Sequence, residues 1–181
     1  VEFGKKARTK LVEGIDILAD AVVSTLGPNG RNVFIQKGIV DPPQSTKDGV
    51  TVARSIVLKD PELEMGVQAM KYAAIKTADK AGDGTTTSTL LAREMVHAGL
   101  EGLNNGENAV KIKRDIDKSV KQVISKLKDI AEDISDESQL TQIATVSANN
   151  DEEIGSLIST GIEKVGPKGV VHIETSKTGE T

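Results

Sequence analysis

Apolar residues in the first part of the chain recur at steps of three or four, which is the spacing of one face of a helix. Between positions 4 and 26 this stripe consists of Ala7, Leu11, Ile15, Leu18, Val22 and Leu26. Gly27-Pro28 comes next, and we expect the helix to end there because proline cannot continue the hydrogen-bond ladder. Beyond it, β-type residues at 32–35 and a second extended piece leading into Lys47 predict short strands.

Two further helices are predicted in the middle of the chain. Aspartate is a favoured N-cap and proline suits the first helical position, so Asp60-Pro61 predicts a helix start. This helix is expected to run to Gly82. The next one is expected to begin near Thr85 and to end before Gly99.

The stretch after Asn108 has the most regular apolar stripe in the chain. Its members are Ile112, Ile116, Val120, Val123, Leu127 and Ile130. We expect Asn108 to cap this helix, and its length and internal position predict a central core helix. Acidic residues then gather at 129–136 and the helical period stops, which indicates a boundary or hinge.

Two shorter helices and a strand are predicted in the last part of the chain. The inward-facing residues of the first helix are expected to be Leu140, Ile143 and Ala144. The second helix should cover about 151–165, because Asn150 and Glu153 have the spacing of a capping box. Residues 170–174 read as a strand.

Length and composition predict a mainly α-helical protein with short β hairpins. The chain has 181 residues, which is enough for one domain and the beginning of a second. We expect the division near residue 132, where the acidic cluster lies. Aromatic residues make up only 2% and tryptophan is absent, so the core is expected to be aliphatic.

Several kinds of chemistry are excluded or disfavoured. The chain has no cysteine, which excludes disulfides, cysteine-based zinc sites and thiol catalysis. His97 and His172 have no second ligand at metal spacing. A net charge of −4 argues against nucleic acid as a partner, and the basic residues at 111–128 alternate with acids as on a solvated helix face. No apolar run approaches the ~20 residues that span a bilayer, so no membrane partner is expected.

The stretch AGDGTTTST at positions 81–89 sets an aspartate between two glycines and follows it with hydroxyl residues. A helix N-terminus has unpaired N–H groups and a partial positive charge, so phosphate binds there readily. Asp83 would repel phosphate unless a cation lies between them, and Mg²⁺ binds through one or two carboxylates plus phosphate oxygens. The alternative is purely structural: Gly82 ends one helix, and Asp83 or Thr85 caps the next.

Two other loops combine glycine with polar residues. TLGPNGR at 25–31 ends a helix in a glycine loop, and TKDGVT at 46–51 sets a cation and a carboxylate before a short helical segment. Each alone is explained by a helix cap, with a turn in the first and a surface lysine in the second. Together with 81–89 they could converge on one nucleotide, which none of them indicates singly.

Taken together, these segments resemble the group I chaperonins, the double-ring protein-folding ATPases. The similar motifs are TLGPNGRNV, TKDGVTVARSI, AGDGTTTSTLLA, VSANNDEEIG and VGPKGVV, in the order and spacing of that family. The likeness covers essentially the whole chain. It implies that residues 1–132 are the amino-terminal part of the equatorial ATP-binding domain and 133–181 the ascending half of the α+β intermediate domain. The apical domain and the carboxy-terminal equatorial part would be absent from this chain.

The resemblance also implies a set of site residues. The nucleotide contacts would be Thr25, Leu26, Gly27 and Pro28, with Lys47 near the phosphates. Asp83 would bind Mg²⁺, and the phosphate cradle would be Gly84, Thr85, Thr86 and Thr87. Asp48 would be the catalytic carboxylate, near the γ-phosphate and the attacking water. The implied cofactors are ATP and Mg²⁺, and the resemblance also allows K⁺.

By the same resemblance, we expect an ATPase subunit that assembles with copies of itself in a heptameric ring. The complete protein would encapsulate and refold unfolded clients under a co-chaperonin lid, whereas the isolated chain is expected to be incompetent in hydrolysis. Residues 32–35 would belong to a stem-loop that pairs with a neighbouring subunit, or to an internal hairpin. A cytoplasmic location is expected, with the mitochondrial matrix or plastid stroma as alternatives.

Two other functions stay open at this point. The chain can be a truncated fragment or paralogue that acts as a non-hydrolysing ring component or interaction module. It can also be a helical scaffold in which every Gly-Thr loop is only a helix cap.

Overall fold

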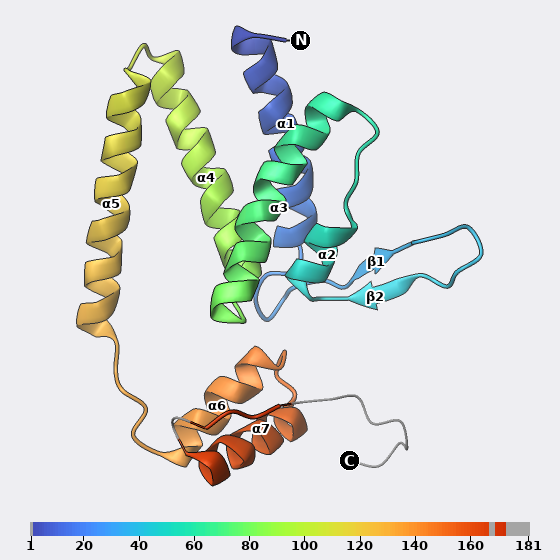
Figure 1. The fold of residues 1–181 in the computed structure, drawn as a ribbon, viewed down its shortest axis with the longest axis vertical. Coiled ribbons are helices and arrows are strands. Elements are labelled where there is room, and N and C mark those ends of the chain that lie inside the picture. Colours follow the sequence, from blue (N-terminus) through green and yellow to red (C-terminus); the bar gives the residue numbers. More distant parts are fainter. Residues whose placement is uncertain (1, 167–168, 173–181) are drawn as a thin grey trace. The chain divides into compact units, whose positions relative to one another are not determined.

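The structure is a computed structural model that describes residues 2–166 and 169–172. Its elements are α1 (Gly4–Val23), β1 (Val33–Ile35), β2 (Gln44–Thr46), α2 (Gly49–Ser55), α3 (Pro61–Ala81), α4 (Thr85–Asn104), α5 (Ala109–Ile130), α6 (Glu137–Ser147) and α7 (Glu152–Val165) (Figure 1). The prediction of a mainly helical fold with short strands is confirmed. No helix among the described residues is long and apolar enough to cross a membrane.

The chain contacts divide into two compact units, Val1–Val123 and Ile124–Thr181. The division falls within α5, whereas the acidic cluster predicted it near residue 132. The assignment of the two parts to chaperonin domains stays a prediction.

The core of the first unit lies between α1, α2 and α3, with β1 and α4 at its sides. The predicted stripe of α1 supplies Ile15, Leu18 and Val22, all of which are buried. The other buried members of the cluster are Ile35, Val52, Ala53, Val67, Met70 and Ala74. Leu26 does not belong to the stripe, because α1 ends at Val23 and the Leu26 side chain is exposed. The core is aliphatic, as the composition predicts.

Two glycines let α1 and α3 touch backbone to backbone. A Cβ added at Gly14 would lie 2.0 Å from the Leu63 carbonyl oxygen, and one added at Gly66 would lie 2.0 Å from the Leu11 carbonyl oxygen. No side chain larger than hydrogen fits at either position unless the helices move apart. This crossing sets the distance between α1 and α3.

A short hairpin leads from α1 to α2. β1 and β2 are antiparallel, with Val33 opposite Thr46 and Ile35 opposite Gln44. Side chains alternate along β1, so Ile35 enters the core while Phe34 is 71% exposed. The hairpin ends directly before the predicted site residues that precede α2.

The structure corrects the predicted end of α4. Gly99 was expected to stop this helix, but α4 continues to Asn104. A Cβ at Gly99 would meet Ile112 at 3.7 Å, and one at Gly102 would meet the same side chain at 3.0 Å. These glycines therefore face α5 instead of ending the helix, and Gly106, with φ +87°, lies in the turn that follows.

The prediction that α5 is a central core helix is wrong for this chain. Among the described residues, α5 has none that is buried. Ile112 and Ile116 lie against α4, but the rest of the stripe is exposed: Val120, Val123, Leu127 and Ile130. The helix itself was predicted correctly from its amphipathic period, but the period gives no information about which element covers the apolar face.

In the second unit, α6 and α7 pack together. Ala144 is buried as predicted, but Ile143 is 51% exposed and does not face inward. The Thr141 hydroxyl donates to the Ser159 hydroxyl at 2.9 Å. A Cβ at Gly155 would lie 2.1 Å from Thr145 Oγ1, so this glycine allows the close approach of the two helices.

Two expectations for the second unit need correction. The N-cap of α7 is Asp151, whose carboxylate accepts from the Ile154 N–H, and not Asn150. Asn150 has φ +65°, which differs from the extended conformation of an N-cap. For the strand expected at 170–174, the described part, 170–172, is not a strand, and the remainder lies outside the described residues.

Glu64 connects α3 by a hydrogen bond to Leu58, in the segment between α2 and α3. The Leu58 N–H donates to Glu64 Oε2 at 2.7 Å, and the Gln68 amide donates to the other carboxylate oxygen. These hydrogen bonds and the charge of Lys71 lower the pKa of Glu64 below its ordinary value of 4.5.

We expect Gly66→Ala to lower the free energy of unfolding by about 1–3 kcal/mol or more, because the added methyl overpacks a backbone contact. Gly99→Ala is the matched control, since its methyl would meet Ile112 at an ordinary 3.7 Å. Loss of glycine there should stabilise the helix by up to ~1 kcal/mol. Urea denaturation measures both variants, and equal effects of the same sign would contradict the close crossing.

A second prediction concerns acid stability. The pKa of Glu64 is lower in the folded than in the unfolded chain, so its stabilisation exists above the ordinary pKa and is lost as pH falls through the lowered value. We expect Glu64→Gln to be less stable than the wild type at neutral pH, with a gap that closes as pH falls through the lowered pKa of Glu64. Denaturation at a series of pH values tests this, and a constant gap would refute it.

Candidate functional site

The loop after α1 is closed by its own backbone. The Gly30 N–H donates to Gly27 O at 2.9 Å, and the Arg31 N–H donates to Ser24 O at 2.8 Å. A Cβ at Gly30 would lie 2.2 Å from Thr25 O, so only glycine fits there. Gly27 has φ +70°, which glycine adopts without strain.

Thr25 is the buried residue of this loop. Its hydroxyl donates to Val22 O at 2.7 Å, which turns the side chain back along α1. The other predicted contacts in the loop, Leu26, Gly27 and Pro28, are exposed. The loop is thus anchored through Thr25 and open to solvent along the next three residues.

Asp48 caps α2. Its Oδ1 accepts from the Val50 N–H at 3.3 Å, and its Oδ2 accepts from the Thr51 N–H at 3.0 Å and from the Thr51 hydroxyl. The cap interpretation of this loop is therefore correct for Asp48. Lys47, one residue earlier, is exposed.

The AGDGTTTST stretch forms the junction of α3 and α4. Gly82, with φ +75°, is the C-cap of α3, and Gly84, with φ +82°, is the N-cap of α4. Asp83 lies exposed between them, and its Oδ1 accepts from the Gly84 N–H at 2.6 Å. Because Gly84 has no side chain, the N-cap residue leaves the first N–H groups of α4 without a side-chain acceptor. Added Cβ atoms at both glycines would meet nothing within 4 Å, so the approach to this helix start is open.

The hydroxyl row of α4 divides into two sets. Ser88 Oγ and Thr89 Oγ1 each donate to Thr85 O at 2.9 Å, so they serve the helix itself. Thr85 is buried and Thr87 is exposed. Thr86 is the hydroxyl that reaches another element.

The three loops meet at Thr86. Thr25 Oγ1 and Thr86 Oγ1 lie 3.2 Å apart, although the residues are separated by 61 positions. A Cβ at Gly49 would lie 2.5 Å from Thr86 Oγ1 and 3.4 Å from Val22 Cγ1, so the start of α2 lies against the same hydroxyl. The sequence suggested that these loops could converge, and the structure brings Thr25, Gly49 and Thr86 together.

Asp83 and Lys47 flank this meeting point but do not touch it in the described hydrogen bonds and ion pairs. At ~3.8 Å per residue, the Asp83 Cα lies within about 11 Å of Thr86 and the Lys47 Cα within about 8 Å of Gly49. Both side chains are exposed. The structure therefore places them near the three loops without joining them.

The described residues do not form a metal site from protein side chains alone. No group of three or more His, Cys, Asp or Glu within residues 2–166 and 169–172 could hold a metal ion. A cation at Asp83 would need further oxygen ligands from phosphate and water, which is how Mg²⁺ is usually held. The residues present thus fit a magnesium ion that arrives with a phosphate.

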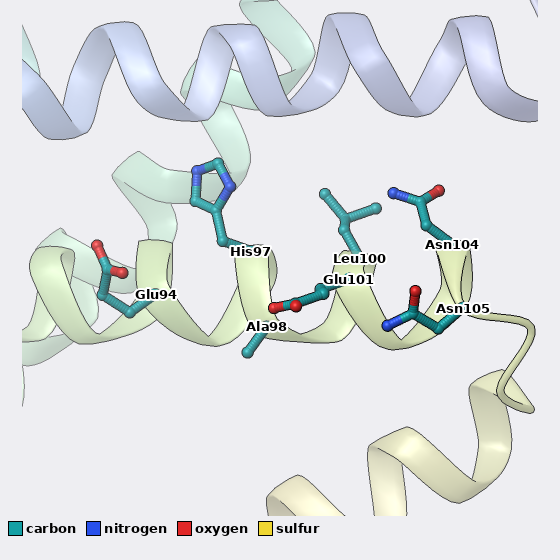
Figure 2. A pocket seen from close by; sticks show the side chains of 7 residues that line it. All are labelled: Glu94, His97, Ala98, Leu100, Glu101, Asn104 and Asn105. Carbon is teal, nitrogen blue, oxygen red and sulfur yellow. The ribbon is translucent and has the colours of Figure 1, made fainter.

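A separate hollow lies along the second half of α4 (Figure 2). It measures about 550 Å³ and is lined by Glu94, His97, Ala98, Leu100, Glu101, Asn104 and Asn105. Glu94 follows Thr86 by eight residues, or about 12 Å of helix. This hollow contains no predicted site residue, and it is distinct from the place where the three loops meet.

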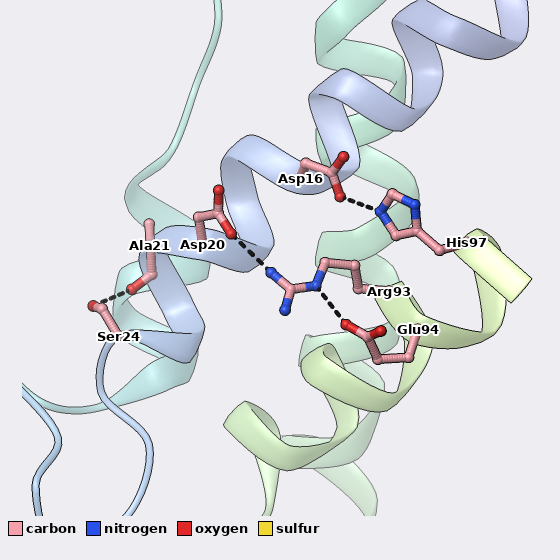
Figure 3. A network of polar contacts seen from close by, with 7 residues as sticks. All are labelled: Asp16, Asp20, Ala21, Ser24, Arg93, Glu94 and His97. Atoms are coloured by element: carbon pink, nitrogen blue, oxygen red, sulfur yellow. Dashed lines mark hydrogen bonds and ion pairs between the residues drawn. The ribbon is translucent and has the colours of Figure 1, made fainter.

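Polar contacts between α1 and α4 were missed by the sequence reasoning (Figure 3). Arg93 Nη1 donates to Asp20 Oδ1 at 2.7 Å, and His97 Nε2 lies 2.7 Å from Asp16 Oδ1. The partners are 73 and 81 positions apart, so no local pattern pairs them.

The fold and the site define a predominantly helical protein whose polar loops gather at one helix start. Residues 18–179 match the model of the TCP-1/cpn60 chaperonin family. The chain belongs to this family.

Solved structures agree with the match. Two crystal structures of the chaperonin gp146 from the bacteriophage EL 2 (Pseudomonas aeruginosa), both in the presence of ATP-BeFx, are 36% identical to this chain. Crystal form II gives a TM-score of 0.72 over 86% of this chain and 27% of that chain. Crystal form I gives 0.73 over 87% and 28%. This chain thus spans little more than a quarter of the length of those proteins.

The contact between Gly49 and Thr86 predicts a non-additive pair of substitutions. Gly49→Ala should lower the free energy of unfolding by about 1–3 kcal/mol, because the methyl meets the Thr86 hydroxyl. Thr86→Ala in the same chain should recover about 0.5 kcal/mol or more of this loss. Thr87→Ala is the control, since Thr87 is exposed and should be additive with Gly49→Ala. Urea denaturation of the full cycle measures the coupling, and additivity for both pairs would rule out the contact.

Proposed function

We propose that this chain is the amino-terminal part of a chaperonin subunit and binds Mg-ATP where the three loops meet. The observation that carries the proposal is the 3.2 Å contact between Thr25 and Thr86, with Gly49 against the same hydroxyl. Family membership and the crystallisation of gp146 with an ATP analogue support it.

The start of α4 is proposed to hold the phosphates. Its first N–H groups have no acceptor from the N-cap residue, and the dipole of a 20-residue helix adds a partial positive charge. Gly82 and Gly84 leave the approach open, and the exposed Thr87 hydroxyl can add a donor. Thr25 to Pro28 would lie beside the nucleotide, as in the family resemblance.

The charged residues would take separate roles. Asp83 is exposed and would ligate Mg²⁺, which offsets the charge of the phosphates when bound. Lys47 would add a second positive charge near the same oxygens. Asp48 would orient the attacking water: its Oδ1 accepts a single hydrogen bond, so an acceptor position remains on that oxygen.

We assign hydrolysis, ring assembly and the refolding of clients to the complete protein. This chain corresponds to 27–28% of the related structures, and the second half of the apolar stripe of α5, from Val120 to Ile130, is exposed within the described residues. An exposed apolar stripe of this kind marks a surface that packs against further protein, from the same subunit or another.

The second candidate is a ring component that binds nucleotide without hydrolysing it. The cap formed by Asp48 favours it, because three hydrogen bonds already hold this carboxylate to its own helix. Phosphate release by the complete protein separates the two: turnover supports the ATPase, and binding without turnover supports the alternative.

Mg-ATP titration with thermal unfolding tests the binding proposal. A ligand at 100 times its Kd should add about 2.7 kcal/mol to the free energy of unfolding. Asp83→Asn should weaken binding about tenfold or more with Mg²⁺ present and little in EDTA, since only the magnesium contact is lost.

Asp79→Asn removes the same charge one turn earlier in α3 and is the matched control. If Asp79→Asn and Asp83→Asn behave alike, the role assigned to Asp83 is wrong. If the wild type gains no stability from Mg-ATP at any concentration, the binding proposal fails.

A further inference from the structure

Arg93 joins α4 to the last turn of α1 (Figure 3). Its Nη1 donates to Asp20 Oδ1 at 2.7 Å, and its Nε donates to Glu94 Oε1 at 3.0 Å. The Arg93 side chain is 20% exposed, whereas its partners Asp20 and Glu94 are 74% and 59% exposed, so the arginine packs along the helices and meets two carboxylates at the surface. An arginine used in two directions is fixed in orientation more firmly than a lysine would be.

Asp20 is connected in turn to the loop that contains Thr25. The Ser24 N–H donates to the Asp20 carbonyl at 3.2 Å, and the Arg31 N–H donates to the Ser24 carbonyl at 2.8 Å. Asp20 therefore bonds both to Arg93, through its side chain, and to the start of the loop, through its carbonyl. A shift of Asp20 along the α1 axis would carry Thr25 with it.

Arg93 also shares a face of α4 with the meeting point of the loops. It follows Thr86 by seven residues, which is two turns and about 10 Å of helix. Residues seven apart lie on one face: Arg93 contacts Asp20 in the last turn of α1, and Thr86 contacts Thr25 in the loop that follows it. His97 continues the line one turn further, where it meets Asp16.

The apolar contacts between these helices do not set their axial position by themselves. Ala92 and Val96 of α4 pack against the core cluster, which contains residues of α1. Contacts between apolar side chains are non-directional, whereas a charge-assisted hydrogen bond has a preferred distance and angle. Apart from the Thr25–Thr86 contact itself, the Asp20–Arg93 pair supplies the directional contact between α1 and α4 that lies nearest to the loop.

We propose that Arg93 is a positioning residue of the nucleotide site: through Asp20 it sets the axial position of α4 against α1 and thereby keeps Thr25 beside Thr86. The part that concerns ATP rests on the proposed function. The part that concerns the Ser24–Arg31 loop does not, so the two can be tested separately.

The test is Arg93→Met in the complete protein, which keeps the length of the side chain and removes its charge. We expect Mg-ATP to bind about fivefold more weakly, the upper range for an exposed ion pair. KM for ATP should rise by the same factor, while kcat stays within about twofold because Arg93 touches no reacting atom. Without nucleotide, hydrogen exchange in residues 24–31 should become faster.

Two further variants make the result specific. Arg114→Met makes the same change on α5, where the ion pairs among the described residues use Lys111, Lys113 and Lys126 instead of Arg114, and it should leave binding and exchange unchanged. Exchanging the charges with Asp20→Arg and Arg93→Asp together should restore binding to within about twofold, although each single change weakens it.

The binding and exchange results together decide whether Arg93 positions the loop. Unchanged exchange in 24–31 with unchanged binding overturns the proposal, and so does faster exchange throughout α1 and α4 that the charge exchange does not reverse. If the wild type itself fails to bind Mg-ATP, the proposed function falls. The exchange data then still decide whether Arg93 positions the loop.

Discussion

The crossing of α1 and α3 at Gly14 and Gly66 is the constraint on which the rest of the first unit depends. Because neither glycine has a Cβ, each helix meets the other's backbone, and this contact sets their separation. Leu18, Val22 and Val67 are then completely buried in the core that both helices share. Both helices run from the crossing toward the loops, so the end of α1 and the junction of α3 with α4 come together (Figure 1).

The candidate site shares its residues with the architecture that holds it. Asp48 starts α2, Gly82 and Gly84 join two helices, and Thr25 bonds its own helix before it meets Thr86. Structural and functional interpretations of these loops are therefore compatible, because a helix cap and a phosphate site both use the ends of helices. The cap of α4 is a glycine, which leaves the N–H groups of its first turn without a side-chain acceptor.

Much of the fold could be predicted because helical period and cap chemistry are local. The stripe of α1, the Asp60-Pro61 start of α3 and the strands around the hairpin all appear where the sequence placed them. The wrong predictions concern which other element packs against a given face of a helix. Gly99 was predicted to end α4, but it accommodates Ile112. The stripe of α5 was predicted to lie in the core, but most of it, from Val120 to Ile130, is exposed among the described residues.

By itself, the sequence determined the helices, the family and the loops that could bind phosphate. Each of these depends on residues that are close together in the chain. Only the tertiary structure decided which hydroxyl of the row reaches across: Thr86 meets Thr25 and Gly49, whereas Ser88 and Thr89 turn back on α4. It also decided that Arg93 pairs with Asp20, 73 positions away. Contacts between distant segments depend on how helices cross, and a single periodic pattern contains no information about its partner.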